Sequence, residues 1–251
     1  MNHYIDTEFL EGTQRETFPI NLFRKETKPT IDLISVGIVA EDSREYYAIS
    51  KDFNLKEAWN RHEFKSYDNQ GNLLSKPRKI YWIRENVLKS IFLELCEKEN
   101  IFATGKKDYF TFKNFKGLLN KYGKTNKQIA REIKCFVANV PTEQSKGTAE
   151  AAIESNNIKP KFYAYYADYD WTVFCWLFGT MIDLPKGFPM YCVDLKQELD
   201  RKAIKHFNSY SLKEAITGIK ELHTYPKQTN EHNALADANW NKRLHEFLKE
   251  I

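Results

Sequence analysis

The stretch YIDTEFLEG, residues Tyr4 to Gly12, places Asp6 and Glu8 two positions apart in an otherwise apolar, strand-like run. Side chains on a strand alternate between its two faces, so both carboxylates project from one face, about 7 Å apart along the strand. Carboxylates that close repel each other unless a cation neutralises them, and Mg²⁺ or Mn²⁺ is the usual partner of such oxygen ligands. A lone Asp-x-Glu pair is more often two solvated acids on an edge strand, so a metal site requires further acids.

The segments that follow this stretch predict an α/β fold with a mixed sheet flanked by helices. Runs rich in Ile, Val, Tyr and Phe between polar turns indicate strands, whereas a helical period of apolar residues indicates helices. The expected strands are 4–9, 31–40, 45–53 and 161–167, and the expected helices are 82–100, 127–137, 170–181, 211–222 and 232–251. Three successive strands indicate that the first part of the sheet is antiparallel. The later alternation of helix and strand is typical of parallel strand pairing.

Composition narrows the class of protein. The chain has 251 residues, of which 42% are hydrophobic, and this is too apolar for a disordered protein. It contains no apolar run of about 18 residues that would predict a membrane span. The N-terminus lacks the basic-then-apolar order of a signal peptide, so we expect a cytoplasmic protein. A net charge of +4 permits a polyanionic partner without requiring one.

The organisation of the chain predicts a single domain over residues 1–251. No internal repeat, low-complexity tract or Gly/Ser-rich linker divides the sequence. The four cysteines are far apart and form no CxxC pair, so neither a zinc site nor a disulfide framework is indicated.

Further acids stand at two later boundaries between expected elements. Asp168 and Asp170 end the strand 161–167, and ligands of open α/β sheets usually bind at such a strand-to-helix junction. Asp170 also stands at the expected start of a helix, where its ordinary role would be that of the N-cap. His232 and Asp237 lie near the start of the last helix. They can face the same site only if His232 lies just before that helix, because five residues turn an ideal helix well past a full revolution.

Taken together, these residues resemble the three motifs of the DEDD superfamily of 3′–5′ exonucleases, in its histidine-containing branch. The chain is most similar to the bacterial and phage exoribonuclease group related to mycobacterial RNase AS, which acts on RNA 3′ ends with an adenylate preference. The matching blocks are YIDTEF (4–9), IDLISVGIVAEDSREYYAIS (31–50), YAYYADYDWTVFCWLFG (163–179), MYCVDLKQEL (190–199) and HNALADANWN (232–241). This resemblance implies an RNase H-like fold.

The resemblance also implies a role for each candidate residue. Asp6, Glu8 and Asp237 would hold one divalent ion, and Asp6 with Asp170 would hold a second, both being Mg²⁺ or Mn²⁺. Two such ions can stabilise the attacking and leaving oxygens of a displacement at phosphorus. His232 would accept a proton from the attacking water, since histidine exchanges protons near neutral pH.

The implied substrate is single-stranded RNA with a free 3′ end, and the implied products are nucleoside 5′-monophosphates. Asp170 is preferred to Asp168 as the metal ligand, because the family pattern places an aromatic residue before its acid and a helix after it, as Tyr169 and Trp171 do here. The group also implies a homodimer.

The chain departs from the family pattern by two insertions, around residues 10–30 and 100–127. The second contains seven lysines and one acid between Gly105 and Lys127, interleaved with the aromatic residues Tyr109, Phe110, Phe112, Phe115 and Tyr122. Such a segment could bind single-stranded RNA through phosphates and bases. Alternatively, it is a helical or hairpin excursion whose aromatic residues pack on the core.

Phe9 allows a similar pair of interpretations. It could stack on a terminal base, but strand alternation turns it away from Asp6 and Glu8 and favours a place in the core.

Two alternatives to an exoribonuclease stay open at this stage. The same fold and metals could serve a DNA exonuclease or a hydrolase of small phosphodiesters, because none of the five candidate residues recognises a 2′-hydroxyl group. A non-catalytic nucleic-acid-binding protein is the other alternative, although such a protein has no physical reason to keep four mutually repelling carboxylates.

Overall fold

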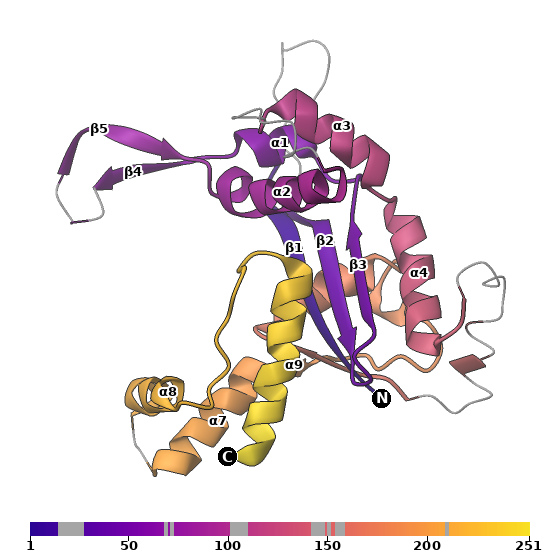
Figure 1. Ribbon diagram of the computed structural model, residues 1–251, viewed down its shortest axis with the longest axis vertical. Coiled ribbons are helices and arrows are strands. Elements are labelled where there is room, and N and C mark those ends of the chain that lie inside the picture. The colour runs from indigo at the N-terminus through magenta and orange to yellow at the C-terminus, as the bar shows by residue number, and fades with distance from the viewer. Residues whose placement is uncertain are drawn as a thin grey trace. The chain divides into compact units, whose positions relative to one another are not determined.

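The computed structural model describes residues 1–14, 28–67, 70, 73–100, 110–141, 149, 152–153, 159–208 and 211–251 (Figure 1). The chain divides into two compact units. Unit 1 comprises Met1–Phe9, Leu33–Ser50 and Lys124–Ile251, and unit 2 comprises Leu10–Asp32 and Lys51–Gly123. The single domain expected from the sequence stays a prediction. In the described part of the chain, no helix is long and apolar enough to cross a membrane.

The predicted mixed sheet is confirmed. Five strands lie in the order β3-β2-β1-β6-β7, the first three antiparallel and the others parallel to β1. The strands are β1 (Asn2–Gly12), β2 (Thr30–Ala40), β3 (Glu45–Ile49), β6 (Lys161–Ala164) and β7 (Val193–Asp194). Because neighbours β1, β2 and β3 alternate in direction, β1 ends, β2 begins and β3 ends at the same end of the sheet.

One face of the sheet packs against α9 (Ala234–Glu250). Helix α7 (Leu195–Phe207) packs against α9, and α8 (Leu212–Glu221) packs against α7. Tyr4 of β1, Val39 of β2 and Tyr163 of β6 belong to one buried apolar cluster with Leu244 of α9. Since alternate residues of a strand share a face, Asp6 and Glu8 lie on the same side of β1 as Tyr4.

The opposite face packs against α4 (Asn126–Ala138) and α6 (Ala167–Trp176). The ring of His3 in β1 lies 6.2 Å from that of Phe136 in α4. The ring of Phe162 in β6 lies 5.1 Å from that of Phe174 in α6. Helices therefore cover both faces of the sheet, as an α/β sheet that is buried on both sides requires.

A glycine lets the start of α9 lie directly against β2. A Cβ atom at Gly37 would come within 2.2 Å of the backbone oxygen of Ala234, closer than a side-chain carbon can approach. Asn233 caps the helix, since its Oδ1 accepts a hydrogen bond from the backbone N–H of Ala236 at 3.1 Å. Farther along α9, Asn241 donates to the backbone oxygen of Ile5 in β1 at 2.8 Å. These contacts fix the start of α9 relative to β1.

Unit 2 contains short helices and a two-stranded sheet of its own. Its elements are α1 (Leu55–Asn60), β4 (Glu63–Tyr67), β5 (Leu73–Ile80), a π-helical segment η1 (Ile83–Leu88), α2 (Lys89–Lys98) and α3 (Phe112–Tyr122). The helix expected over 82–100 is observed, with its first part in the wider π form. The β4–β5 hairpin was missed, because Pro77 and the surrounding basic residues interrupt the apolar alternation that indicates a strand.

Phe110, Phe112 and Phe115 of the second insertion pack within unit 2, as the helical alternative predicts. The ring of Trp59 lies 4.8 Å from that of Phe110 and 5.6 Å from that of Phe112. Phe115 is buried. Tyr109 and the rest of 101–109, like residues 15–27 of the first insertion, lie outside the described residues.

One boundary differs from the prediction in a way that concerns the candidate site. Strand β6 ends at Ala164 and α6 begins at Ala167, so Asp170 is the fourth residue of the helix. The prediction that Asp170 is the N-cap is wrong. The chain turns early because Tyr166 has a left-handed backbone, with φ of 58°, which ends the extended run of aromatic residues.

Candidate active site

The sequence-predicted residues come together around one cavity of unit 1. This acidic cavity has a volume of about 270 Å³ and is lined by Asp6 and Glu8 of β1, Asp170 of α6, and His232 and Asp237 at the start of α9. Asp168 does not line it and is exposed to solvent. The preference for Asp170 over Asp168 is therefore consistent with the geometry.

Three of the acids are close enough to share one cation. A carboxylate oxygen of each of Asp6, Glu8 and Asp237 lies within 4.8 Å of one from each of the other two. Asp6 is half-buried, whereas Glu8 and Asp237 are buried. A cluster of carboxylate oxygens with part of its surface open is the donor set that hard divalent cations prefer, so these residues fit Mg²⁺ or Mn²⁺.

Asp170 is held in place by the residue between the first two acids. Its Oδ1 accepts hydrogen bonds from the backbone N–H of Thr7 at 2.7 Å and from the hydroxyl of Thr7 at 2.6 Å. Asp170 is buried, and both bonds favour its ionised form. Thr7 therefore joins the start of α6 to β1. Sequence analysis missed this role, although Thr7 stands between the two acids of the opening motif.

Asp237 is held by two donors from the segment before α9. Its Oδ1 accepts from Nε2 of Gln228 at 2.6 Å, and its Oδ2 accepts from the backbone N–H of His232 at 2.9 Å. Each oxygen keeps a further lone pair for a cation. No sequence signal identified Gln228, because it lies in an irregular segment and meets Asp237 only through the fold.

His232 lies just before α9, as the sequence argument required. Its backbone has a φ of 65°, a left-handed conformation that costs energy for a residue other than glycine. Tyr166, which has the same feature, also lines the acidic cavity. Strained backbone of this kind often occurs at functional sites. The hydrogen bond from the His232 backbone to Asp237 helps to hold this conformation.

Burial and mutual repulsion raise the pKa of the carboxyl groups. The pKa of Asp6 is raised well above its ordinary value by burial of the carboxyl group and by the charges of Asp170, Glu8 and Asp237. The pKa of Glu8 is raised to about 8 by burial and by the charges of Asp237 and Asp170. Burial also raises the pKa of Asp170, against the lowering effect of the Thr7 hydrogen bonds. The folded chain thus concentrates negative charge that a divalent cation would neutralise.

Aromatic side chains form the rest of the wall. The ring of Phe9 stacks on that of Tyr169 with centroids 5.6 Å apart and planes 8° apart. Phe9 is half-buried, so the expectation that it belongs to the core is wrong. The rings of Tyr165 and Trp240 meet edge to face at 5.0 Å. The acidic cavity therefore combines carboxylates with flat apolar surfaces.

Part of the chain is similar in sequence to known proteins. No family model matches the chain. Two 3′–5′ exoribonucleases of Mycobacterium tuberculosis, from strains H37Rv and CDC 1551, are each 41% identical over 58 residues. The match covers 23% of this chain and 26% of each relative, so it spans about a quarter of the length of these curated relatives. It supports a distant relation to that group.

Proposed function

We propose that this protein is a divalent-metal-dependent 3′–5′ exoribonuclease that removes nucleoside 5′-monophosphates from the 3′ end of single-stranded RNA. The observation that carries the proposal is the convergence of Asp6, Glu8, Asp170, His232 and Asp237 around one cavity. The partial similarity to two mycobacterial 3′–5′ exoribonucleases supports the same reaction.

The acids would hold the metal ions. Asp6, Glu8 and Asp237 form the three-oxygen cluster for the first ion, and Asp6 with Asp170 would hold the second. Bound there, Mg²⁺ or Mn²⁺ would stabilise negative charge that develops on the phosphate oxygens and on the attacking water.

The chain's own residues then position and move the reacting groups. Water attacks the last phosphorus atom of the RNA, and the bond from that phosphorus to the 3′ oxygen of the preceding nucleotide breaks. His232, which is half-buried and anchored through its backbone to Asp237, would accept the proton of the attacking water at a ring nitrogen. Thr7 keeps the Asp170 carboxylate oriented toward the cavity while this occurs.

The size and walls of the acidic cavity support removal of single nucleotides from an end. A volume of about 270 Å³ lies near the lower limit for small-ligand sites and suits one nucleotide. The stacked Phe9 and Tyr169 rings provide an apolar surface against which a base can lie.

An adenylate preference and a homodimer belong to the same proposal. The dimer predicts a solution mass near twice the 29.6 kDa of the chain.

A time course with labelled oligonucleotides tests the proposal. Oligoadenylate and its deoxy counterpart, each labelled at the 5′ end, are incubated with Mn²⁺, Mg²⁺ or EDTA and resolved on a sequencing gel. A metal-dependent ladder that shortens from the 3′ end of RNA is the expected result. Shortening of DNA alone would overturn the choice of substrate, and intact oligonucleotides under every metal would overturn the nuclease itself.

A further inference from the structure

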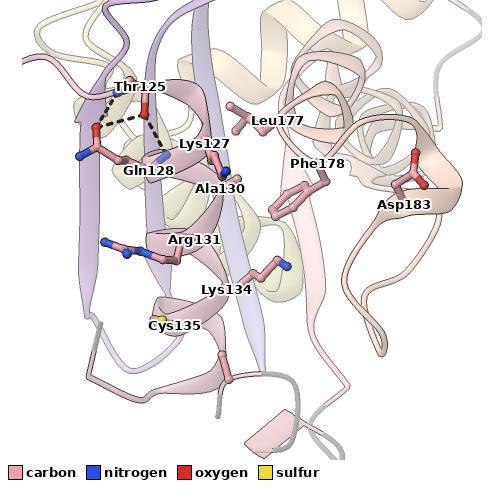
Figure 2. Close-up of a pocket in the computed structure, with 11 residues that line it drawn as sticks. Thr125, Lys127, Gln128, Ala130, Arg131, Lys134, Cys135, Leu177, Phe178 and Asp183 are labelled. Carbon is pink, nitrogen blue, oxygen red and sulfur yellow. Dashed lines mark hydrogen bonds between the residues drawn. The ribbon is translucent and has the colours of Figure 1, made fainter. Parts of the chain in front are cut away.

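A second cavity in unit 1 lies between α4 and the segment that follows α6. It has a volume of about 610 Å³. Its described lining consists of Thr125, Lys127, Gln128, Ala130, Arg131, Lys134, Cys135, Ala149, Leu177, Phe178 and Asp183. Figure 2 shows side chains of α4 along one wall and Leu177 and Phe178 along the other. Three cations and one acid are among these residues, and we term this site the basic cavity.

The three cations form a row along α4. Lys127, Arg131 and Lys134 are separated by four and three positions, so they stand on neighbouring turns of the helix. Figure 2 shows Lys127 and Lys134 extended toward the wall of Leu177 and Phe178, and Arg131 extended away from it. From Lys127 to Lys134 the row is about 10 Å long at 1.5 Å per residue. Among the described residues, no acid lies within ion-pair distance of Lys127 or Arg131. The positive charge of the row is therefore only partly compensated.

The start of α4 adds to this positive potential. Lys127 is the second residue of α4, and the first turn of the helix contains no acid. The N-terminal end of a helix carries partial positive charge and disfavours a cation there unless an anion is near. Thr125 and Gln128 cap the helix with their own side chains, and neither neutralises the charge. An anionic ligand would relieve this unfavourable arrangement.

The acid in the lining is turned toward its own loop. Oδ2 of Asp183 accepts hydrogen bonds from the backbone N–H of Thr180 at 2.8 Å and from its hydroxyl at 2.7 Å. Figure 2 shows Asp183 on the far side of Phe178 from α4. The wall that faces Lys127 and Lys134 is therefore formed by Leu177 and the half-buried Phe178, which can contact the flat face of a base.

The acidic cavity and the basic cavity lie near opposite ends of α6. Tyr169 and Asp170, near the start of α6, line the acidic cavity, and Leu177 and Phe178, just after its end, line the basic one. Eight residues of helix span about 12 Å. The start of α4 is bound to the end of β3, since Lys124 donates its backbone N–H to Ile49 at 2.8 Å. That end of β3 lies at the same end of the sheet as the end of β1.

We propose that the basic cavity binds the phosphate backbone of the RNA strand a few nucleotides upstream of the 3′ end that occupies the acidic cavity. This inference rests on the proposed exoribonuclease function and adds a second binding site for the same substrate. A row of cations about 10 Å long suits more than one phosphate of a strand, because each nucleotide adds one negative charge to the backbone. Arg131 would form paired hydrogen bonds with phosphate oxygens, and Lys127 and Lys134 would add point charges.

The test compares long and short RNA in a variant that lacks the row, Lys127→Gln/Arg131→Gln/Lys134→Gln. Fluorescence anisotropy in EDTA measures binding of a labelled ten-nucleotide oligoadenylate without turnover. We expect its affinity to fall about tenfold or more. The slope of log affinity against log salt should fall by about two units, since each lost contact to a single strand contributes about 0.7. With Mn²⁺, hydrolysis of a dinucleotide should be unchanged, because it cannot reach the basic cavity.

A matched control removes the same number of charges elsewhere. Lys205, Lys213 and Lys220 are exposed on or near α7 and α8 and do not line the basic cavity, so their triple glutamine variant should bind RNA like wild type. Equal loss of binding in this control would overturn the inference, as would unchanged binding in the α4 variant. Lys134 is half-buried, so its replacement could impair folding. In that case the double variant Lys127→Gln/Arg131→Gln, which replaces two exposed residues, tests the inference by the same RNA-binding measurement.

Failure of the inference is distinguishable from failure of the proposed function. The anisotropy measurement needs no cleavage, so it decides the inference even if no RNA is hydrolysed. If the α4 variant cleaves RNA normally and binds RNA as tightly as wild type, the proposed nuclease function stands and only the second RNA-binding site is overturned. Competition in the wild type gives a further check. If a dinucleotide displaces the labelled RNA as effectively as unlabelled long RNA does, the inference that the upstream strand occupies the basic cavity is overturned.

Discussion

The two cavities of unit 1 lie near opposite ends of α6 and are built in different ways. The acidic cavity has a volume of about 270 Å³ and takes its charged groups from β1, α6 and α9. The basic cavity has a volume of about 610 Å³ and takes its cations from α4 alone. In the first, like charges are held together by hydrogen bonds from Thr7, Gln228 and the His232 backbone. In the second, like charges are spaced along one helix.

This difference matches the two proposed functions, catalysis in the acidic cavity and phosphate binding in the basic cavity. A reaction centre must hold repelling groups within a few ångströms of each other, so it needs tertiary contacts that oppose the repulsion. A surface for a phosphate backbone needs only positive charge at regular intervals, which one helix supplies. Changes to tertiary packing should therefore damage the acidic cavity far more than the basic one.

The largest effect is expected from Asp6→Asn. This change removes the carboxylate proposed to contact both ions, so turnover should fall on the order of a thousandfold or more. Removal of one of four clustered negative charges relieves repulsion, so the metal-free protein should unfold at the same or a higher urea concentration. RNA binding in EDTA should not weaken.

The matched control for this change is Asp168→Asn. Asp168 is exposed and lies two positions before Asp170, and its replacement should leave turnover within about twofold of wild type. Comparable loss of activity in both variants would contradict the assignment of the site, and unfolding of the Asp6 variant would indicate a structural role instead.

Gly37→Ala tests the dependence of the acidic cavity on packing. The new methyl group would collide with the backbone at Ala234 and push the start of α9, with His232 and Asp237, away from β2. We expect the free energy of unfolding to fall by about 1–3 kcal/mol and turnover to fall about a hundredfold. Urea unfolding and steady-state kinetics measure the two quantities.

A second glycine provides the control for Gly37. A Cβ atom at Gly117, inside α3, would meet nothing within 4 Å. Gly117→Ala should therefore stabilise the protein by about 0.5–1 kcal/mol and leave turnover unchanged. Wild-type turnover in Gly37→Ala would show that the position of α9 does not depend on this close contact.

The stability of the metal-free protein should depend on pH through the acidic cavity. The folded-state pKa of Glu8 is raised from 4.5 to about 8, so folding favours the protonated carboxyl. The stabilisation is fully present below about pH 4.5 and is lost as the pH rises toward 8. Each unit of raised pKa corresponds to about 1.4 kcal/mol. Urea unfolding in EDTA at pH 5 and pH 8 measures the loss.

Two comparisons sharpen this pH experiment. Mn²⁺ or Mg²⁺ should restore stability at pH 8, because an ion that binds only the folded state stabilises it. The α4 triple variant should show the same pH dependence as wild type, since its cations line the other cavity. A metal-free protein that is more stable at pH 8 than at pH 5 would contradict the raised carboxyl pKa values.

The smallest effect is expected from Thr7→Val, which keeps the backbone donor to Asp170 and removes the hydroxyl donor. Because that hydrogen bond lowers the pKa of Asp170, its loss should raise this pKa further. The acidic limb of the pH–rate profile should move to higher pH, so activity falls more at pH 6 than at pH 8. Thr7→Ser keeps a hydroxyl and should restore the wild-type profile.

The sequence by itself predicted four of the five strands of the sheet, missing the two-residue β7, and identified the candidate residues. Runs rich in Ile, Val, Tyr and Phe between polar turns predicted the strands at 4–9 and 31–40, because residues of these types favour extended backbone. The order of acidic motifs, read together, pointed to Asp6, Glu8, Asp170, His232 and Asp237. These signals are local in sequence, so they can be read without a fold.

Tertiary structure alone decided how those residues are held and what surrounds them. Gln228 meets Asp237, Thr7 meets Asp170 and Gly37 admits Ala234 only because segments far apart in sequence fold together. The boundary of α6 was misplaced for the same reason, since a left-handed turn at Tyr166 overrides a run of strand-forming residues. The cations of α4 belong to a helix that the sequence predicted over 127–137. Only the packing of Leu177 and Phe178 opposite it creates a cavity.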